Sequence, residues 1–183
     1  MSGCEAANRN KNLLILGAVQ YGTVVKEIAQ SMGCFEKIDF LDDSFGEDNP
    51  DYHEKSIGKI ADAEAFCTDY LYAIPAIGNP NKRLELIKQL EESCFRVPVI
   101  VSPKAYVSPS AQLQKGVVVE PLAGVHSNTV VSTGTYISMG AEVNHNAVVA
   151  DGCHIGSNAV VLSGVLIKPC TDVEPGTVVK NKF

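Results

Sequence analysis

Histidines are the residues of this chain whose side chains point most directly to chemistry. Three of the four lie in the C-terminal half, at His126, His145 and His154. A neutral imidazole accepts a proton near neutral pH, and imidazole is also a common zinc ligand. A three-histidine zinc site needs two imidazoles close together on one chain, whereas these three are 19 and 9 residues apart. The spacing therefore predicts no metal site and leaves proton transfer as the chemistry to consider.

A hexapeptide repeat must position these histidines. Every sixth residue from Val101 to Val179 is aliphatic, and a second position four places later is small or β-branched in all but the last repeat. Glycine, asparagine and serine crowd the positions between, as expected of turns. This pattern predicts a left-handed parallel β-helix over residues 101–183, in which three repeats make one coil. An α-helix is excluded, because a period of six does not stay on one face of a helix with 3.6 residues per turn.

The register of the repeat places both late histidines outside the core of the β-helix. His145 lies two residues after the inward Val143, on a turn that a substrate could reach, and His154 directly precedes the inward Ile155. The register never slips, so no coil is expected to carry a protruding loop. Flat faces of parallel strands bearing valines must be covered, and we therefore expect a homotrimer of β-helices packed side by side.

The residues before the repeat alternate between strand and helix patterns, which predicts a Rossmann-like α/β domain over residues 12–100. The continuous apolar run 13–16 is typical of a strand buried on both faces of a parallel sheet. The remaining expected elements are a helix at about 24–32, a strand at 37–41, a short helix at 61–67, a strand at 69–78 interrupted by Pro75, a helix at 82–92 capped by Asn79 or Asn81, and a last strand at 95–101.

The first strand–turn–helix–strand unit resembles the start of a nucleotide-binding fold. Gly17 and Gly22 bound the turn, and Asp42 and Asp43 end the next strand, where an acid commonly meets a ribose. The turn lacks the middle glycine of the dinucleotide fingerprint, which disfavours NAD. A tight structural turn without a ligand is the alternative.

Composition restricts which binding partners and which cell compartment are expected. The net charge is −6, with 15 basic and 21 acidic residues and no cationic run, so nucleic acid and anionic membranes are not expected partners. No segment approaches the roughly 20 apolar residues of a membrane span, and the N-terminus lacks the apolar core of a signal peptide. We therefore expect a cytoplasmic protein. The six cysteines show no CxxC spacing, and reduced thiols are expected rather than disulfides.

The order of these parts resembles the bacterial sugar acetyltransferases of the NeuD/PglD type, which include sialic-acid O-acetyltransferases and UDP-4-amino-sugar N-acetyltransferases. The resemblance covers nearly the whole chain. The matching segments are 15–18 with Gly22, 40–43, 76–79 with 82–83, Pro103 with Ala105, and 143–146 followed by 154–155. The resemblance implies an acetyl-CoA-dependent acetyltransferase that acts on an amino or hydroxyl group of a sugar or nucleotide sugar, with acetyl-CoA bound between neighbouring β-helices of a trimer.

The resemblance also implies roles for particular residues. His145 is the expected general base, and His154 is the expected hydrogen-bond donor to the thioester of acetyl-CoA. Further acetyl-CoA contacts are expected at Ser163, Gly164 and Pro175, with Lys168, Lys180 and Lys182 near the CoA phosphates. The nucleotide sugar is expected at Val19, Gln20, Tyr21, Asp42, Asp43, Gly78 and Asn81.

The sequence departs from this family at the position that follows the catalytic histidine. An acid is usual there and is thought to raise the basicity of the histidine, but this chain has Asn146, which orients a ring without stabilising an imidazolium by charge. Catalysis is therefore expected to be weaker. Two alternatives stay open: a non-catalytic trimer that binds a nucleotide sugar or serves as a scaffold, and a hexapeptide transferase with another acceptor, such as an amino acid. The residues do not distinguish an amine from a hydroxyl acceptor.

Overall fold

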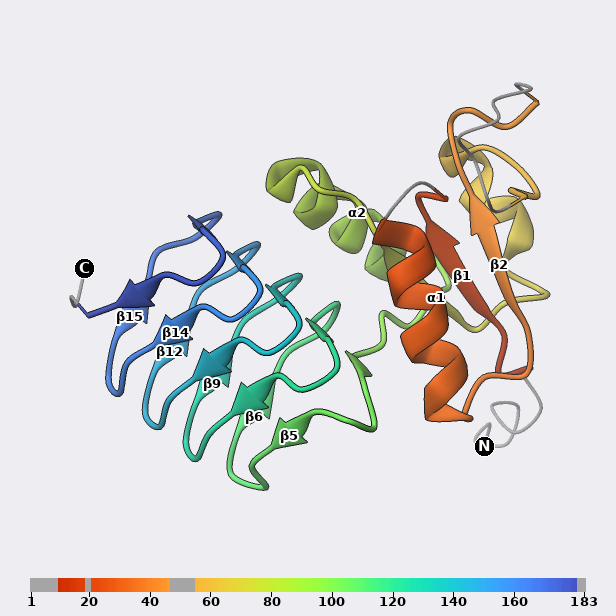
Figure 1. Ribbon diagram of the computed structural model, residues 1–183. Helices are drawn as coiled ribbons and strands as arrows, with labels where there is room; N and C mark the ends of the chain where they lie inside the picture. The colour runs from red at the N-terminus through yellow and green to blue at the C-terminus, as the bar shows by residue number, and fades with distance from the viewer. Residues whose placement is uncertain (1–9, 19–20, 47–54, 181–183) are drawn as a thin grey trace, which may run out of the picture.

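The computed structural model describes residues 10–18, 21–46 and 55–180, which form an α/β part followed by a stack of coils (Figure 1). The elements of the first part are β1 (Leu13–Leu16), α1 (Tyr21–Met32), β2 (Ile38–Leu41), the 3-10 helix η1 (Ile60–Phe66), β3 (Tyr72–Pro75) and α2 (Pro80–Glu92). The three strands form a parallel sheet in the order β2-β1-β3. Pro75 ends β3 at an edge of this sheet, as its missing N–H group predicts.

Helices cover both faces of the three-stranded sheet, because the residues of β1 that point to either face are apolar and need burial. Leu13 and Ile15 pack with Val25 and Ile28 of α1. Leu14 and Leu16 pack with residues of α2, including Leu86 and Leu90. The helix predicted at 82–92 is confirmed and begins two residues earlier, at Pro80. Its N-cap is Asn79, whose Oδ1 accepts a hydrogen bond from the Lys82 N–H at 3.1 Å.

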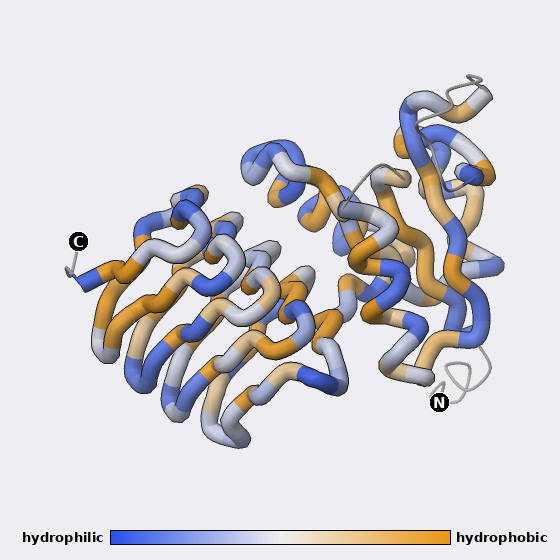
Figure 2. Tube along the Cα trace, viewed as in Figure 1, coloured by the Kyte–Doolittle hydropathy of each residue, from blue (hydrophilic) through white to orange (hydrophobic). Residues whose placement is uncertain are grey.

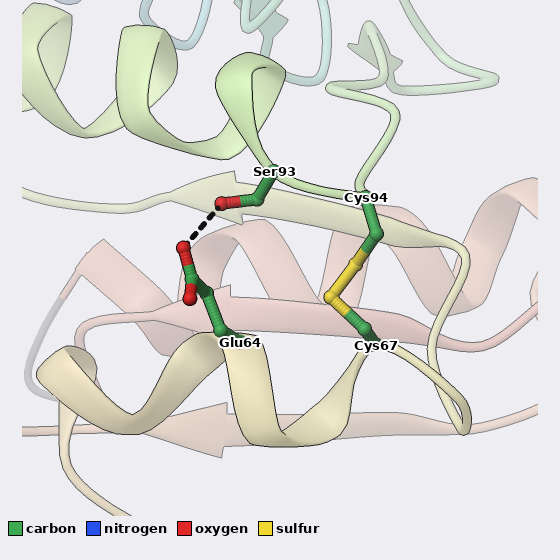
Figure 3. Close-up of a disulfide and its surroundings, with 4 residues drawn as sticks. All are labelled: Glu64, Cys67, Ser93 and Cys94. Atoms are coloured by element: carbon green, nitrogen blue, oxygen red, sulfur yellow. Dashed lines mark hydrogen bonds between the residues drawn. A yellow bond between two sulfur atoms is a disulfide. The ribbon is translucent and has the colours of Figure 1, made fainter.

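A disulfide joins η1 to the end of α2, so the expectation of reduced thiols is wrong for this pair. Cys67 directly follows η1, Cys94 lies two residues beyond α2, and their Cα atoms are 5.8 Å apart (Figure 3). Beside the bridge, the Ser93 hydroxyl donates to Glu64 Oε1 at 3.0 Å. The spacing of 27 residues carries no signal in the sequence, because the two cysteines meet only when α2 packs across the sheet.

The last strand predicted for the α/β part, at 95–101, is also wrong. Arg96 makes only an isolated bridge to Tyr72, and the strand that does form, β4 (Ile100–Val101), pairs with β7 in the β-helix. Pro98 lies between them and cannot donate a backbone hydrogen bond. The β-helix therefore starts at Ile100.

Figure 1 shows the coils of the β-helix as a regular stack. The β-helix is left-handed, and its described residues, up to 180, form fourteen two-residue strands. After β4 these are β5 (Tyr106–Val107), β6 (Gln112–Leu113), β7 (Val118–Val119), β8 (Gly124–Val125), β9 (Val130–Val131), β10 (Tyr136–Ile137), β11 (Glu142–Val143), β12 (Val148–Val149), β13 (His154–Ile155), β14 (Val160–Val161), β15 (Leu166–Ile167), β16 (Asp172–Val173) and β17 (Val178–Val179). Every pairing links residues 18 apart, so the predicted register is confirmed.

Three sheets form the sides of the β-helix. Sheet I holds β4, β7, β10, β13 and β16, sheet II holds β5, β8, β11, β14 and β17, and sheet III holds β6, β9, β12 and β15. The chain turns at corner I–II (for example 139–140), corner II–III (for example 145–146) and corner III–I (for example 151–152). The predicted inward positions form one continuous core, and Figure 2 shows the hydrophobic residues recurring along each coil. The core thus consists of aliphatic residues alternating with small ones.

Glycines at corner III–I allow α2 to dock on the β-helix. Gly116, Gly134 and Gly152 all have a positive φ. A Cβ atom at Gly116 or Gly134 would lie 2.7 or 2.8 Å from Cδ1 of Ile87. The α/β part also covers the outer face of sheet I, where Val118 and Tyr136 are buried against it. No helix in the described ranges is long and apolar enough to cross a bilayer.

Candidate active site

His145 projects from corner II–III, between β11 and β12. Its side chain is exposed, and its carbonyl oxygen accepts a hydrogen bond from the Gly164 N–H at 3.1 Å. Asn146, which adopts a left-handed φ of 59°, donates through Nδ2 to His145 Nδ1 at 2.8 Å. In this arrangement a neutral ring carries its hydrogen on Nε2. Turning the Asn146 amide by half a turn presents Oδ1 instead, which accepts from Nδ1–H and leaves Nε2 free as a base.

Two of the three residues expected, besides His154, to contact acetyl-CoA follow His145 on the same corner. Ser163 and Gly164 lie one coil beyond His145 and Asn146, since each is 18 residues further along an unbroken register. Pro175 lies elsewhere, on corner I–II. The structure therefore brings Ser163 and Gly164 to His145 and places Pro175 apart from them. Lys168 and Lys180 are exposed, and Lys182 lies outside the described residues.

His154 lies on the outer face of sheet I, between Tyr136 and Asp172 in the strand ladder. Its Nδ1 is 3.0 Å from Asp172 Oδ1, and its Nε2 is 2.8 Å from the Ser138 hydroxyl. An ionised carboxylate only accepts hydrogen bonds, so Nδ1–H donates to Asp172 and Nε2 accepts from Ser138. Both ring nitrogens are thus engaged. Donation from Nε2 to a thioester would require His154 to be protonated and to release Ser138.

A small pocket of about 160 Å³ opens beside His154, where the two parts of the chain meet. Tyr21, Gly78, Arg83 and Tyr136 are among the residues that line it. The Tyr21 ring stacks on Tyr136 with centroids 4.4 Å apart, and its hydroxyl donates to Glu120 Oε1 at 3.1 Å. Burial, and secondly the negative charge of Glu120, hold the pKa of Tyr21 well above its ordinary value. We call this hollow the junction pocket.

The side chain of Tyr21 therefore points at the β-helix and is not available to cover a phosphate, although its backbone lies at the start of α1. Val19 and Gln20, predicted to share that role, lie outside the described residues. Gly78 lies at the junction pocket. Asn81 is exposed in the first turn of α2, and its Oδ1 is 3.7 Å from the Cys170 thiol.

Asp42 and Asp43 have different environments. Asp42 is buried, and its Oδ2 accepts from the Ala18 N–H at 2.7 Å while Oδ1 accepts from the N–H and hydroxyl of Ser44. Burial alone would raise the pKa of Asp42, but the hydrogen bonds from Ser44 and Ala18 outweigh burial and lower it. Asp42 thus braces the turn after β1. Asp43 is exposed and lines a groove of about 370 Å³ between η1 and α2, which Lys82 also lines.

The comparisons with known proteins agree with these two parts. Residues 12–90 match the PglD N-terminal domain family. Over these residues the chain is similar to that family. The acetyltransferase domain of PglB from Neisseria gonorrhoeae, solved with acetyl coenzyme A, is 26% identical with a TM-score of 0.77, over 92% of this chain and 87% of that chain. Its structure without that ligand gives a TM-score of 0.79 at 26% identity, over 93% and 92%.

A more distant structure shows the fold alone. WeeI from Acinetobacter baumannii is 18% identical with a TM-score of 0.73, over 93% of this chain and 92% of that chain. No curated protein matches the chain. The predicted resemblance to the NeuD/PglD-type sugar acetyltransferases is confirmed, as is the order of an α/β domain and a left-handed β-helix.

One chain does not bring the two histidines together. Corner II–III, which carries His145, lies opposite sheet I, which carries His154, because each corner of a three-sided prism faces one side. The α/β part covers sheet I and so lies on the side of His154. Among the described residues, no cluster of three or more His, Cys, Asp or Glu could hold a metal ion.

Sequence reasoning missed four residues of the junction pocket and its surroundings: Arg83, Tyr136, Ser138 and Asp172. The repeat contained the signal for two of them, since Tyr136 and Asp172 lie 18 residues before and after His154. Ser138 follows Tyr136 by two residues. Arg83 lies in the segment 82–83 that carries the family resemblance, but the sequence does not indicate its burial, which depends on contact with the β-helix.

Proposed function

We propose that this chain is an acetyl-CoA-dependent acetyltransferase that acts on an amino or hydroxyl group of a nucleotide sugar. The observation that carries the proposal is the likeness over nearly the whole chain to the PglB acetyltransferase domain, which was solved with acetyl coenzyme A. A GDP-perosamine N-acetyltransferase from Caulobacter crescentus, solved as a variant with CoA and GDP-perosamine, has the same fold at 18% identity and a TM-score of 0.59, over 91% of this chain and 92% of that chain.

His145 acts as the general base in this proposal. The acceptor nitrogen or oxygen attacks the thioester carbon and passes its proton to His145 Nε2, and the tetrahedral intermediate then collapses with the CoA thiolate as leaving group. Asn146 holds the ring through Oδ1 during this step. An amide gives no charge stabilisation to the imidazolium that forms, so a reduced rate relative to an acid at this position is part of the proposal.

We place the acetyl-CoA site between subunits of a homotrimer. His145, Ser163 and Gly164 come from one subunit, and His154 and Pro175 come from its neighbour. The support is the opposite orientation of the two histidines within one chain, together with exposed apolar side chains on sheet II and corner I–II. These are Tyr106, Leu122, Met139, Leu162 and Val178, of which Tyr106 is 60% exposed and Leu122 68% exposed. Corner II–III borders sheet II, so packing this sheet against a neighbour would carry His145 toward it.

The nucleotide sugar lies across the first turn of α2 in this proposal. Lys82 and Asp43 line the groove on one side of the turn, where a nucleoside fits, and Gly78 and Arg83 line the junction pocket on the other side, next to His154. Asn81 and the backbone N–H groups of the first turn of α1, which begins at Tyr21, complete the site. Val19 and Gln20 lie outside the described residues and stay predictions from the sequence. Helix N-termini favour phosphate through their free N–H groups. Asp42 supports the turn without contacting the ligand.

The test is release of CoA from acetyl-CoA in the presence of a panel of UDP- and GDP-linked amino sugars and sialic acids. Turnover with one acceptor, and a loss of about 10² to 10⁴ in rate for His145→Ala, is the expected result. Nucleotide-sugar binding by calorimetry without turnover for any acceptor would favour the alternative of a non-catalytic scaffold, which the amide of Asn146 in place of an acid also favours.

The shared site has its own test. Sedimentation equilibrium should give a trimer, and a concentration-independent monomer would end this part of the proposal. Inactive His145→Ala and His154→Ala subunits, coexpressed and purified as mixed trimers, should regain part of the activity, because some interfaces then carry both native histidines. No recovery would show that the two histidines do not act together in a site shared between subunits. We also propose a cytoplasmic location, as expected from the sequence, and cell fractionation tests it; recovery in an oxidising compartment, where a disulfide such as Cys67–Cys94 persists, would contradict it.

A further inference from the structure

Arg83 is a buried cation without a carboxylate partner. It lies in the first turn of α2 and is 1% exposed. None of the ion pairs found in the described part of the chain includes it. Backbone carbonyls satisfy its guanidinium instead: Nε donates to Gly134 at 2.7 Å, Nη1 to Ile77 at 2.7 Å and Gly78 at 3.0 Å, and Nη2 to Gly152 at 2.9 Å.

These carbonyls belong to two different parts of the molecule. Ile77 and Gly78 lie in the loop between β3 and α2, where the nucleotide sugar is proposed to bind. Gly134 and Gly152 lie on corner III–I in successive coils, and Gly152 is two residues before His154. The guanidinium thus spans the boundary between the α/β part and the β-helix.

Tyr136 ties the same guanidinium to the strand ladder that contains His154. The Arg83 guanidinium carbon lies 4.0 Å from the centre of the Tyr136 ring, and Tyr136 is the ladder partner of His154. The Tyr136 hydroxyl donates to the Pro75 carbonyl at 2.9 Å, at the end of β3. One side chain therefore contacts the proposed acceptor loop, the strand partner of His154 and the turn that precedes His154.

Stability alone does not account for an arginine at this position. Burying a charge is costly, and well-packed apolar side chains often serve as well or better in such places. A lysine could not replace the planar fork, because it has three donors on one atom and stacks differently on a ring. The guanidinium of Arg83 instead fixes the distance between the Ile77–Gly78 loop and corner III–I, because it is hydrogen-bonded to both.

We propose that Arg83 is a positioning residue that holds His154 at a fixed distance from the Ile77–Gly78 loop, so that an acceptor on this loop meets the acetyl donor beside His154. This inference rests on the proposed function for its catalytic consequence. Its structural consequence, that Arg83 fixes the position of His154, does not rest on the proposed function.

The experiment compares Arg83→Met with Phe95→Leu in the full chain. Phe95 is buried in the same domain, away from α2's first turn and from the junction pocket, so Phe95→Leu reports what loss of stability alone does. NMR of the histidine rings is the first readout. Arg83→Met should shift the His154 ring signals and their pH titration, leaving those of His145 in place, and Phe95→Leu should move neither. Unchanged His154 signals in Arg83→Met would overturn the proposal.

Kinetics are the second readout. A misplacement of about 1 Å costs about 10²-fold in rate, so kcat of Arg83→Met should fall by about this factor, by more than the Kd of the nucleotide sugar rises. Equal losses of kcat in Phe95→Leu, assayed below its unfolding temperature, would contradict a positioning role. If the native protein shows no turnover, the proposed function fails and the NMR result still decides the role of Arg83. Arg83→Lys, which keeps the charge, makes the same test if Arg83→Met does not fold.

Discussion

Breaking the Cys67–Cys94 bridge should lower the unfolding temperature of the protein substantially. The two cysteines are separated by 27 residues, a segment that includes β3 and α2. The chain entropy restored to the unfolded state by opening a loop of this length is worth about 3.5 kcal/mol. In a chain of this size each kcal/mol shifts the midpoint by about 2 to 4 °C, so the expected decrease is about 7 to 14 °C.

Calorimetry of the native protein with and without a phosphine reductant measures this decrease, and thiol counting shows that the bridge has opened. The double variant Cys67→Ala/Cys94→Ala should unfold at the temperature of the reduced protein. Cys34→Ala is the matched control, because Cys34 is exposed and unpaired. An unchanged midpoint after complete reduction would refute the reasoning, since it would mean that the bridge does not restrict the unfolded chain.

Three further predictions follow from local geometry. Gly134→Ala should destabilise by about 1 to 3 kcal/mol more than Gly176→Ala in urea unfolding, because both have a positive φ but only Gly134 has Ile87 within 2.8 Å of a new Cβ. Asp42→Asn should lower the free energy of unfolding by about 1 to 3 kcal/mol above pH 4. The difference in this free energy between the variant and the native protein should shrink as the pH falls, because a lowered pKa stabilises the fold only while the carboxylate is ionised. A difference that persists at pH 2 would contradict this. Asn146→Glu should raise kcat and the apparent pKa of the base in the pH–rate profile, because a carboxylate only accepts from His145 Nδ1–H, whereas Asn146→Ala should not.

The β-helix could be predicted almost residue by residue, whereas the docking of the α/β part could not. Inward positions recur because each coil presents the same two places to one core, and such a constraint is local and periodic. The docking depends on the contact of Ile87 with Gly134 and on the hydrogen bonds of Arg83 to carbonyls of two coils. Neither interaction recurs at a regular interval in the sequence, so no sequence pattern reveals it. The glycines of corner III–I look like ordinary turn residues in the sequence, although they also make room for α2.

The expectation of reduced thiols at Cys67 and Cys94 and the strand predicted at 95–101 were wrong for a similar reason. Cysteine spacing excludes local motifs but says nothing of residues that tertiary packing brings together. The apolar pattern at 95–101 is real, but Pro98 interrupts it and Val99 and Val101 already serve the core of the β-helix. A strand pattern at a domain boundary therefore does not say which domain buries it.

The spacing of His145 and His154 also determines which sides of the β-helix the two histidines face, which a motif match alone does not use. Nine residues are half of an 18-residue coil, so in a register that never slips His145 and His154 must face opposite sides of one β-helix. Any reaction that uses both rings at one acetyl group then needs two chains. The same offset explains why the α/β part can cover the side of His154 while leaving His145 exposed. Catalysis would in that case depend on assembly, since folding of a single chain completes only half of each site.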